Sequence, residues 1–228
     1  MATNHFVQFI TLKYHERFFM IMTLIGKSFA HFSAIYFLTP LVGVFFSLPQ
    51  AACLTVLIFA SKALLTSYPI TGGIPTLCAT LAWATHAQFM NKKNRTSYCG
   101  YFLTMAALPA LCMALFMTHP TVGQGYVYAL YWLIPILLYA LHIISGYSST
   151  FTTALSATFI AHAVGSTLWL FTVPMQPEQW LSLIPIVPVE RIITALSMTL
   201  LCVITKKILS YAQINNKSAK SCSSISDL

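Results

Sequence analysis

Four side chains that could do chemistry lie in one long apolar stretch and share one helix face. They are four, four and three residues apart: Thr158, His162, Ser166 and Trp169. An unpartnered polar group costs several kcal/mol in lipid, so His162 needs a hydrogen-bond partner. That partner is either a neighbouring side chain, which leaves the histidine no ligand role, or a bound small molecule.

A second set of polar residues is expected near the same end of the bundle as Trp169. Glu190 and Arg191 begin the last of these segments, where they form either an interfacial charge pair or the mouth of a pocket. Trp180, in the Pro-rich connector before them, suits either an aromatic belt at the membrane interface or a pocket wall. We predict a substrate-binding site that combines both groups: His162, Ser166, Trp169, Trp180, Glu190 and Arg191.

No familiar catalytic or metal-binding signature accompanies these residues. The sequence lacks G-x-x-x-x-G-K-[ST], H-E-x-x-H and G-x-S-x-G. Four histidines have no metal-ligand spacing: His31, His86, His119 and His142. We therefore expect a protein that is not an enzyme and holds no metal or cofactor, with an intramembrane enzyme as an alternative.

Composition indicates the lipid bilayer as the solvent of most of the chain. Hydrophobic residues make up 57% of it and charged residues 7%, against about 25% charged in an ordinary globular domain. The net charge of +8 comes mostly from basic residues between or beyond apolar runs, which is typical of cytoplasmic loops rather than of nucleic-acid binding. The six cysteines form no C-x-x-C pair and read as buried apolar thiols.

The apolar runs are continuous and about 18 to 22 residues long, which predicts helices rather than barrel strands. We expect an all-α, polytopic transmembrane bundle of six to eight helices. Residues 18–66 fit either two long helices or three shorter ones, with a re-entrant or tilted piece near Pro49 as one arrangement. The later helices are expected at 74–90, 98–118, 126–145, 150–172 and 186–208.

Charge and composition divide the chain into three parts. Residues 1–17 form an N-terminal cytoplasmic segment, 18–210 the bundle, and 211–228 a disordered Ser/Lys/Asn-rich tail. Four helices separate the basic loop 91–95 from Lys206-Lys207, so both basic clusters should lie on one side. The positive-inside rule makes that side cytoplasmic, in the cell's inner membrane.

The predicted helix over 150–172 also carries a stripe of small residues. Ala157, Ala161 and Gly165 are four residues apart and would let another backbone approach closely. This pattern favours an internal position for the helix, with its polar line facing a cavity or a neighbouring helix.

Ala30-x-x-x-Ala34 and the Gly/Pro-rich stretch 71–75 carry a resemblance to a known family. With the chain's size and short loops, they resemble the substrate-binding (S) components of energy-coupling factor vitamin transporters. The resemblance implies that Ala30 and Ala34 dock on a transmembrane coupling subunit energised by ATPases. It also implies a vitamin-like ligand bound near the outer face, in the region of His162, Trp169 and Arg191.

The sequence therefore favours a membrane-embedded uptake protein or substrate-binding transporter subunit for a vitamin-like small molecule. The alternative from another class is a non-transporting scaffold that assembles a complex through small-residue helix faces. An outward-open pocket at the predicted site would favour transport, and a solid bundle would favour the scaffold.

Overall fold

A computed structural model describes residues 39–66, 73–92 and 94–226 of the chain. Every regular element among these residues is helical, as the sequence predicts. In chain order the elements are η1 (Thr39–Leu41), α3 (Val42–Phe45), α4 (Leu48–Thr66), α5 (Ile74–Lys92), α6 (Arg95–Phe102), η3 (Leu103–Ala107), α7 (Leu108–Met117), η4 (Gly123–Trp132), α8 (Leu133–Ser145), α9 (Thr150–Thr172), α10 (Pro177–Ser182) and α11 (Val187–Ser226).

Four stretches within the described part of the chain are long and apolar enough to cross a membrane. They are Arg95–Met117, Gly123–Ser145, Thr150–Thr172 and Val187–Tyr211, of 23, 23, 23 and 25 residues. At 1.5 Å per residue, a helix of that length spans about 34 Å, slightly more than the hydrocarbon core of a bilayer. The chain is therefore an all-α membrane protein, and these four expected helices are confirmed.

The first of these spans is continuous but not uniformly α-helical. Leu103–Ala107 (η3) is a π-helical turn between α6 and α7, and Pro109 follows it directly. Proline has no backbone N–H and its ring crowds the preceding turn, so the helix widens locally instead of breaking. The span keeps its direction across the bundle.

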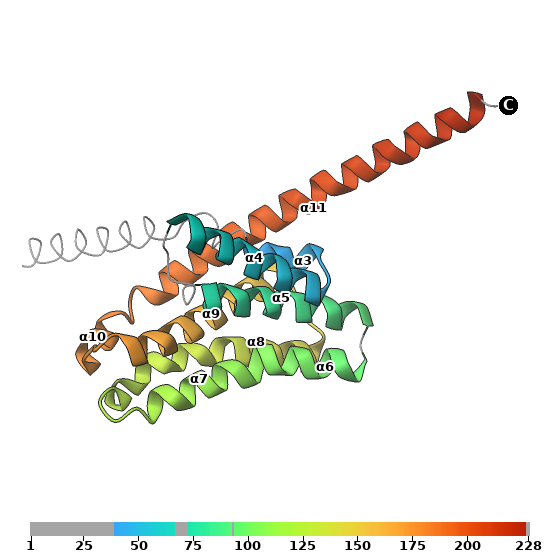
Figure 1. The fold of residues 1–228 in the computed structure, drawn as a ribbon. Helices are drawn as coiled ribbons and strands as arrows, with labels where there is room; N and C mark the ends of the chain where they lie inside the picture. Colours follow the sequence, from blue (N-terminus) through green and yellow to red (C-terminus); the bar gives the residue numbers. More distant parts are fainter. Residues whose placement is uncertain (1–38, 67–72, 93, 227–228) are drawn as a thin grey trace, which may run out of the picture.

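Helix α9 lies at the centre of the bundle (Figure 1). It packs against α5, α11, α7 and α8, and 61% of its most apolar window is buried, against 17% for α11. Ala154 and Ala157 are fully buried, and a Cβ added to Gly165 would lie 3.5 Å from the ring of Pro75 on α5. The small-residue stripe thus serves contacts within the chain, and the expected internal position of α9 is confirmed.

Helix α5 separates α9 from the earlier part of the chain. On its other side pack α3 and α4, which are joined by a turn at 46–47 directly before Pro49. The backbone at Gly43 lies so close to the carbonyl of Thr80 that a Cβ there would clash. The break near Pro49 agrees with the shorter-helix option for 39–66, whereas the remainder of 18–66 lies outside the described residues.

The connectors gather at two opposite ends of the bundle (Figure 1). We call the end with residues 94 and 146–149 the basic end, because Lys206 of α11 lies there, within electrostatic range of His86. Residues 118–122 and 173–186 form the connector end. The predicted placement of both basic clusters at one end is therefore found, while the side of the membrane that this end faces stays a prediction.

Helix α11 is longer than the sequence analysis expects. It crosses the bundle and then continues as one helix to Ser226, away from the other elements (Figure 1). Residues 209–226 contain no proline or glycine that would end a helix. The backbone of residues 211–226 therefore belongs to α11. That the tail 211–228 is disordered in solution stays a prediction.

Candidate ligand-binding site

A hydrogen-bonded network joins α9 to the neighbouring span near the connector end. The hydroxyl oxygen of Tyr128, on η4, lies 2.9 Å from His162 Nε2 and 3.1 Å from Ser166 Oγ. One hydroxyl can donate to one of these atoms and accept from the other. The partner that His162 requires in lipid is therefore Tyr128, a residue that the sequence analysis does not single out.

Thr158, on the same predicted face of α9, takes no part in this network. Its hydroxyl donates to the carbonyl of Leu155, 2.8 Å away, within its own helix. Within the predicted polar line, His162 and Ser166 are thus the residues that join the network around Tyr128.

The charged pair at the start of α11 lies inside the protein. The guanidinium of Arg191 is 3.4 Å from a carboxylate oxygen of Glu190, and the two side chains are only 7% and 16% exposed. Arg191 also lies within electrostatic range of both His162 and Tyr128. Glu190 in the first turn suits the positive end of the helix dipole. Both alternatives, an interfacial charge pair and the mouth of a pocket, stay predictions, because burial against protein does not determine depth in the membrane.

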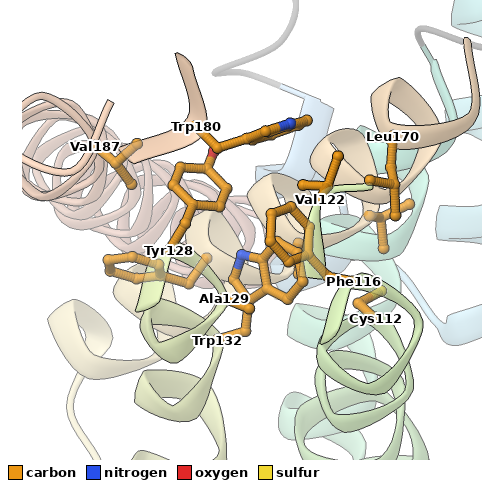
Figure 2. Close-up of a cluster of buried hydrophobic side chains, with 12 residues drawn as sticks. Cys112, Phe116, Val122, Tyr128, Ala129, Trp132, Leu170, Trp180 and Val187 are labelled. Atoms are coloured by element: carbon orange, nitrogen blue, oxygen red, sulfur yellow. The ribbon is translucent and has the colours of Figure 1, made fainter. Parts of the chain in front are cut away.

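Trp180 is also an interior residue, at 1% exposure, which excludes the alternative of an aromatic belt. Its ring contacts Phe116 edge-to-face, with centroids 5.1 Å apart, and Tyr128, with centroids 5.0 Å apart. Trp132 packs against the same two rings. We call Phe116, Tyr128, Trp132 and Trp180 the aromatic cluster; Figure 2 shows these four side chains together.

Trp169 is the one predicted site residue that the structure places apart. Its side chain is 57% exposed on the outside of α9. Pro75, near the start of α5 at Ile74, contacts Gly165, so Trp169 lies one turn beyond the level at which α5 begins. Helical spacing places Trp169 on the same face of α9 as His162. The neighbouring helix α5 does not extend to the level of Trp169, so it leaves this side chain uncovered.

Five of the predicted site residues therefore meet, and a sixth residue holds them together. His162, Ser166, Trp180, Glu190 and Arg191 come from α9, α10 and α11. Tyr128 contacts His162, Ser166 and Trp180 directly and lies within electrostatic range of Glu190 and Arg191. In the sequence it is one of three tyrosines within 126–131, and nothing in the spacing distinguishes it from the other two.

A second polar cluster lies at the basic end. The sequence does not predict that its residues meet. His86 Nε2 is 2.8 Å from Ser148 Oγ, and the hydroxyl of Tyr101 is 2.8 Å from His142 Nδ1. The two imidazole rings face each other with centroids 5.3 Å apart. A cavity of about 10 Å³, room for about one water molecule, lies beside Tyr101 and His142.

These polar groups are not arranged as a metal site. Within residues 39–66, 73–92 and 94–226, no three His, Cys, Asp or Glu side chains are grouped so that they could hold a metal ion. Ala30 and Ala34, the predicted docking residues, lie outside the described residues. The chemistry that the site offers is hydrogen bonding by Tyr128, His162 and Ser166 beside the ion pair of Glu190 and Arg191.

Comparison of the chain with protein-family models, with curated protein sequences and with solved structures found no match.

Proposed function

We propose that this protein is a membrane-embedded uptake component that binds a small molecule at the network around Tyr128. The observation that carries the proposal is the meeting of three membrane spans at buried polar groups. Tyr128, His162 and Arg191 come from three different spans and lie inside the bundle. Ionisable groups in the membrane are expensive to bury, so their presence there argues for a function.

The network can exchange its internal partners for those of a ligand. The Tyr128 hydroxyl, the His162 imidazole and the Ser166 hydroxyl each donate or accept, so a polar ligand can replace one of their mutual bonds without leaving a group unpaired. The ion pair of Arg191 and Glu190 lies beside this network and adds further charged groups to which a polar ligand can bind. The aromatic cluster supplies the apolar wall that such sites usually have.

The positive-inside rule gives the proposal its direction. The basic end would face the cytoplasm, so the connector end and the site would lie near the outer face of the cell's inner membrane. The chain has no nucleotide-binding motif, so transport against a gradient would need a partner. By its resemblance to S components, that partner would be a transmembrane coupling subunit with ATPases, docked through Ala30 and Ala34.

The predicted site is closely packed among the described residues: Tyr128, Trp132 and Trp180 are at most 1% exposed, and the cavity of about 10 Å³ lies at the basic end. This packing favours the scaffold alternative, whereas the helix face on which that alternative depends is already occupied. The small-residue face of α9, on which it depends, is packed inside the chain: Ala157 is fully buried, and Gly165 lies against Pro75 of α5. That face is not free to hold another protein. We therefore retain ligand binding as the proposed function.

The direct test is mass spectrometry of small molecules that co-purify with the protein in detergent. We expect one compound in near-stoichiometric amount with the native protein, and its loss from Tyr128→Phe and His162→Ala. Trp169→Ala is the matched control, because that side chain lies on the same helix but outside the site. Retention of the compound by His162→Ala, or recovery of a stoichiometric protein partner and no compound, contradicts the proposal.

A further inference from the structure

Two buried indole nitrogens in the aromatic cluster have no hydrogen-bond partner. They are Nε1 of Trp132 and Nε1 of Trp180, on side chains that are 0% and 1% exposed. A buried donor without an acceptor costs about 1–3 kcal/mol, and in a bilayer there is little water to supply one. Two such donors in one cluster are available to acceptors that the described residues do not supply.

The two tryptophans differ in what holds them. Trp132 ends η4, within a membrane span, and is fixed by the helix on either side of it. Trp180 lies on α10, a six-residue helix in a connector with prolines at 174, 177, 185 and 188. α10 packs against η4, and one further bond, from the Tyr131 hydroxyl to the Ile184 carbonyl at 2.7 Å, ties the connector to the bundle.

Release of α10 from η4 would place the Trp180 indole where its N–H can find a hydrogen-bond acceptor. The connector lies at the end of the bundle (Figure 1). The limits of the membrane spans place that end at the bilayer surface, where water and lipid headgroups are expected. Indole rings favour that region because the ring is apolar and the N–H finds an acceptor there. Outward movement of α10 would therefore pair the Trp180 nitrogen, while it would vacate a flat space beside Phe116 and Tyr128 (Figure 2).

We propose that the ligand is a planar aromatic molecule with a hydrogen-bond-accepting group, and that its ring takes the place of the Trp180 indole. This inference rests on the proposed function and names its substrate class. The vacated space has the flat shape of an indole and keeps aromatic walls on Phe116 and Tyr128. The groups around it include two donors, Trp132 Nε1 and the Tyr128 hydroxyl, beside the ion pair of Arg191 and Glu190. A ligand that pairs with the donors must bring hydrogen-bond acceptors.

The first test compares binding of benzoate to the native protein and to Trp180→Ala, by calorimetry in detergent at neutral pH. Removal of the indole abolishes the competition, so we expect binding about tenfold or more tighter in the variant. Cyclohexanecarboxylate has the same charge and a puckered ring, and it should not show this gain. Trp169→Ala, which removes an exposed indole, should bind benzoate as the native protein does. Equal binding by Trp180→Ala and Trp169→Ala overturns the proposal.

The second test uses only the native protein, so it can be carried out even if Trp180→Ala does not fold. Hydrogen–deuterium exchange of the native protein is measured with and without a saturating amount of benzoate. We expect faster exchange in residues 177–186, which release from η4 exposes, and no change in the 146–149 connector at the basic end. Unchanged or slower exchange in 177–186 on binding overturns the proposal. A co-purified compound that lacks an aromatic ring would overturn it too, yet leave the proposed function intact.

Discussion

Tyr128 on η4 and His162 on α9 are joined across the bundle by a hydrogen bond of 2.9 Å between the phenol oxygen and Nε2. The same phenol lies 3.1 Å from Ser166 and packs against the ring of Trp180. Tyr128 thus connects the polar network of α9 to the aromatic cluster. Four predictions follow from such relationships between neighbouring elements.

The first prediction concerns the stability contributed by the Tyr128 hydroxyl. Tyr128→Phe keeps the ring but removes the hydrogen-bond partner of both His162 and Ser166. We expect the protein to lose about 1–3 kcal/mol of stability, seen as a lower midpoint of thermal unfolding in detergent. Tyr126→Phe is the control, because Tyr126 is on the same helix and 53% exposed, and it should leave the midpoint unchanged. Equal midpoints for the two variants would mean that the network contributes no stability.

The second prediction concerns the buried pair of Glu190 and Arg191. Arg191→Met leaves a carboxylate that is 16% exposed without its neighbouring cation, and a broken buried pair costs about 3–5 kcal/mol. We expect little folded protein from this variant. The double variant Glu190→Gln/Arg191→Met removes both charges and should recover most of the yield of monodisperse protein on gel filtration. Normal yield from the single variant would show that the charge of Glu190 is compensated by other means.

The third prediction concerns the packing of α9 inside the bundle, where Ala157 belongs to a core cluster shared with α5 and α11. Ala157 is fully buried, so Ala157→Leu forces a larger side chain into a closed interface. Overpacking of this kind costs about 1–3 kcal/mol and should lower the unfolding midpoint. Ser197→Leu makes a similar increase in size on the exposed face of α11, where lipid can accommodate it, and should be tolerated. A variant pair with the reverse order of stability would contradict the internal position of α9.

The fourth prediction concerns the direction of the chain in the membrane. Reporter domains fused after Asn94 and after Ser148 should be active in the cytoplasm, and those fused after Thr121 and after Gln176 on the outer side. The physical reason is the cluster of basic residues at the end of the bundle that holds 94 and 148, together with Lys206. The opposite pattern would invert the protein and place the site around Tyr128 on the cytoplasmic side.

The sequence alone determines the solvent of this protein and most of its helix boundaries. The transfer of a 20-residue helix into lipid depends on its length and composition, both of which are readable without knowledge of its neighbours. The expected helix over 150–172 therefore agrees with α9 at both ends. The C-terminal end of α11 is less well predicted. A segment without proline or glycine carries no local signal that would end the helix where it leaves the bundle.

Only the tertiary structure decides which side chains meet. His162 needs a partner in lipid, but the choice of Tyr128 among neighbouring aromatic residues depends on how η4 packs against α9. Trp169 shares the helix face of His162 yet is exposed, and Trp180, from a connector that looks interfacial, is buried. Helical spacing fixes the direction of a side chain from its own axis. What that side chain touches is set by the position and length of the neighbouring helices, which no single segment encodes.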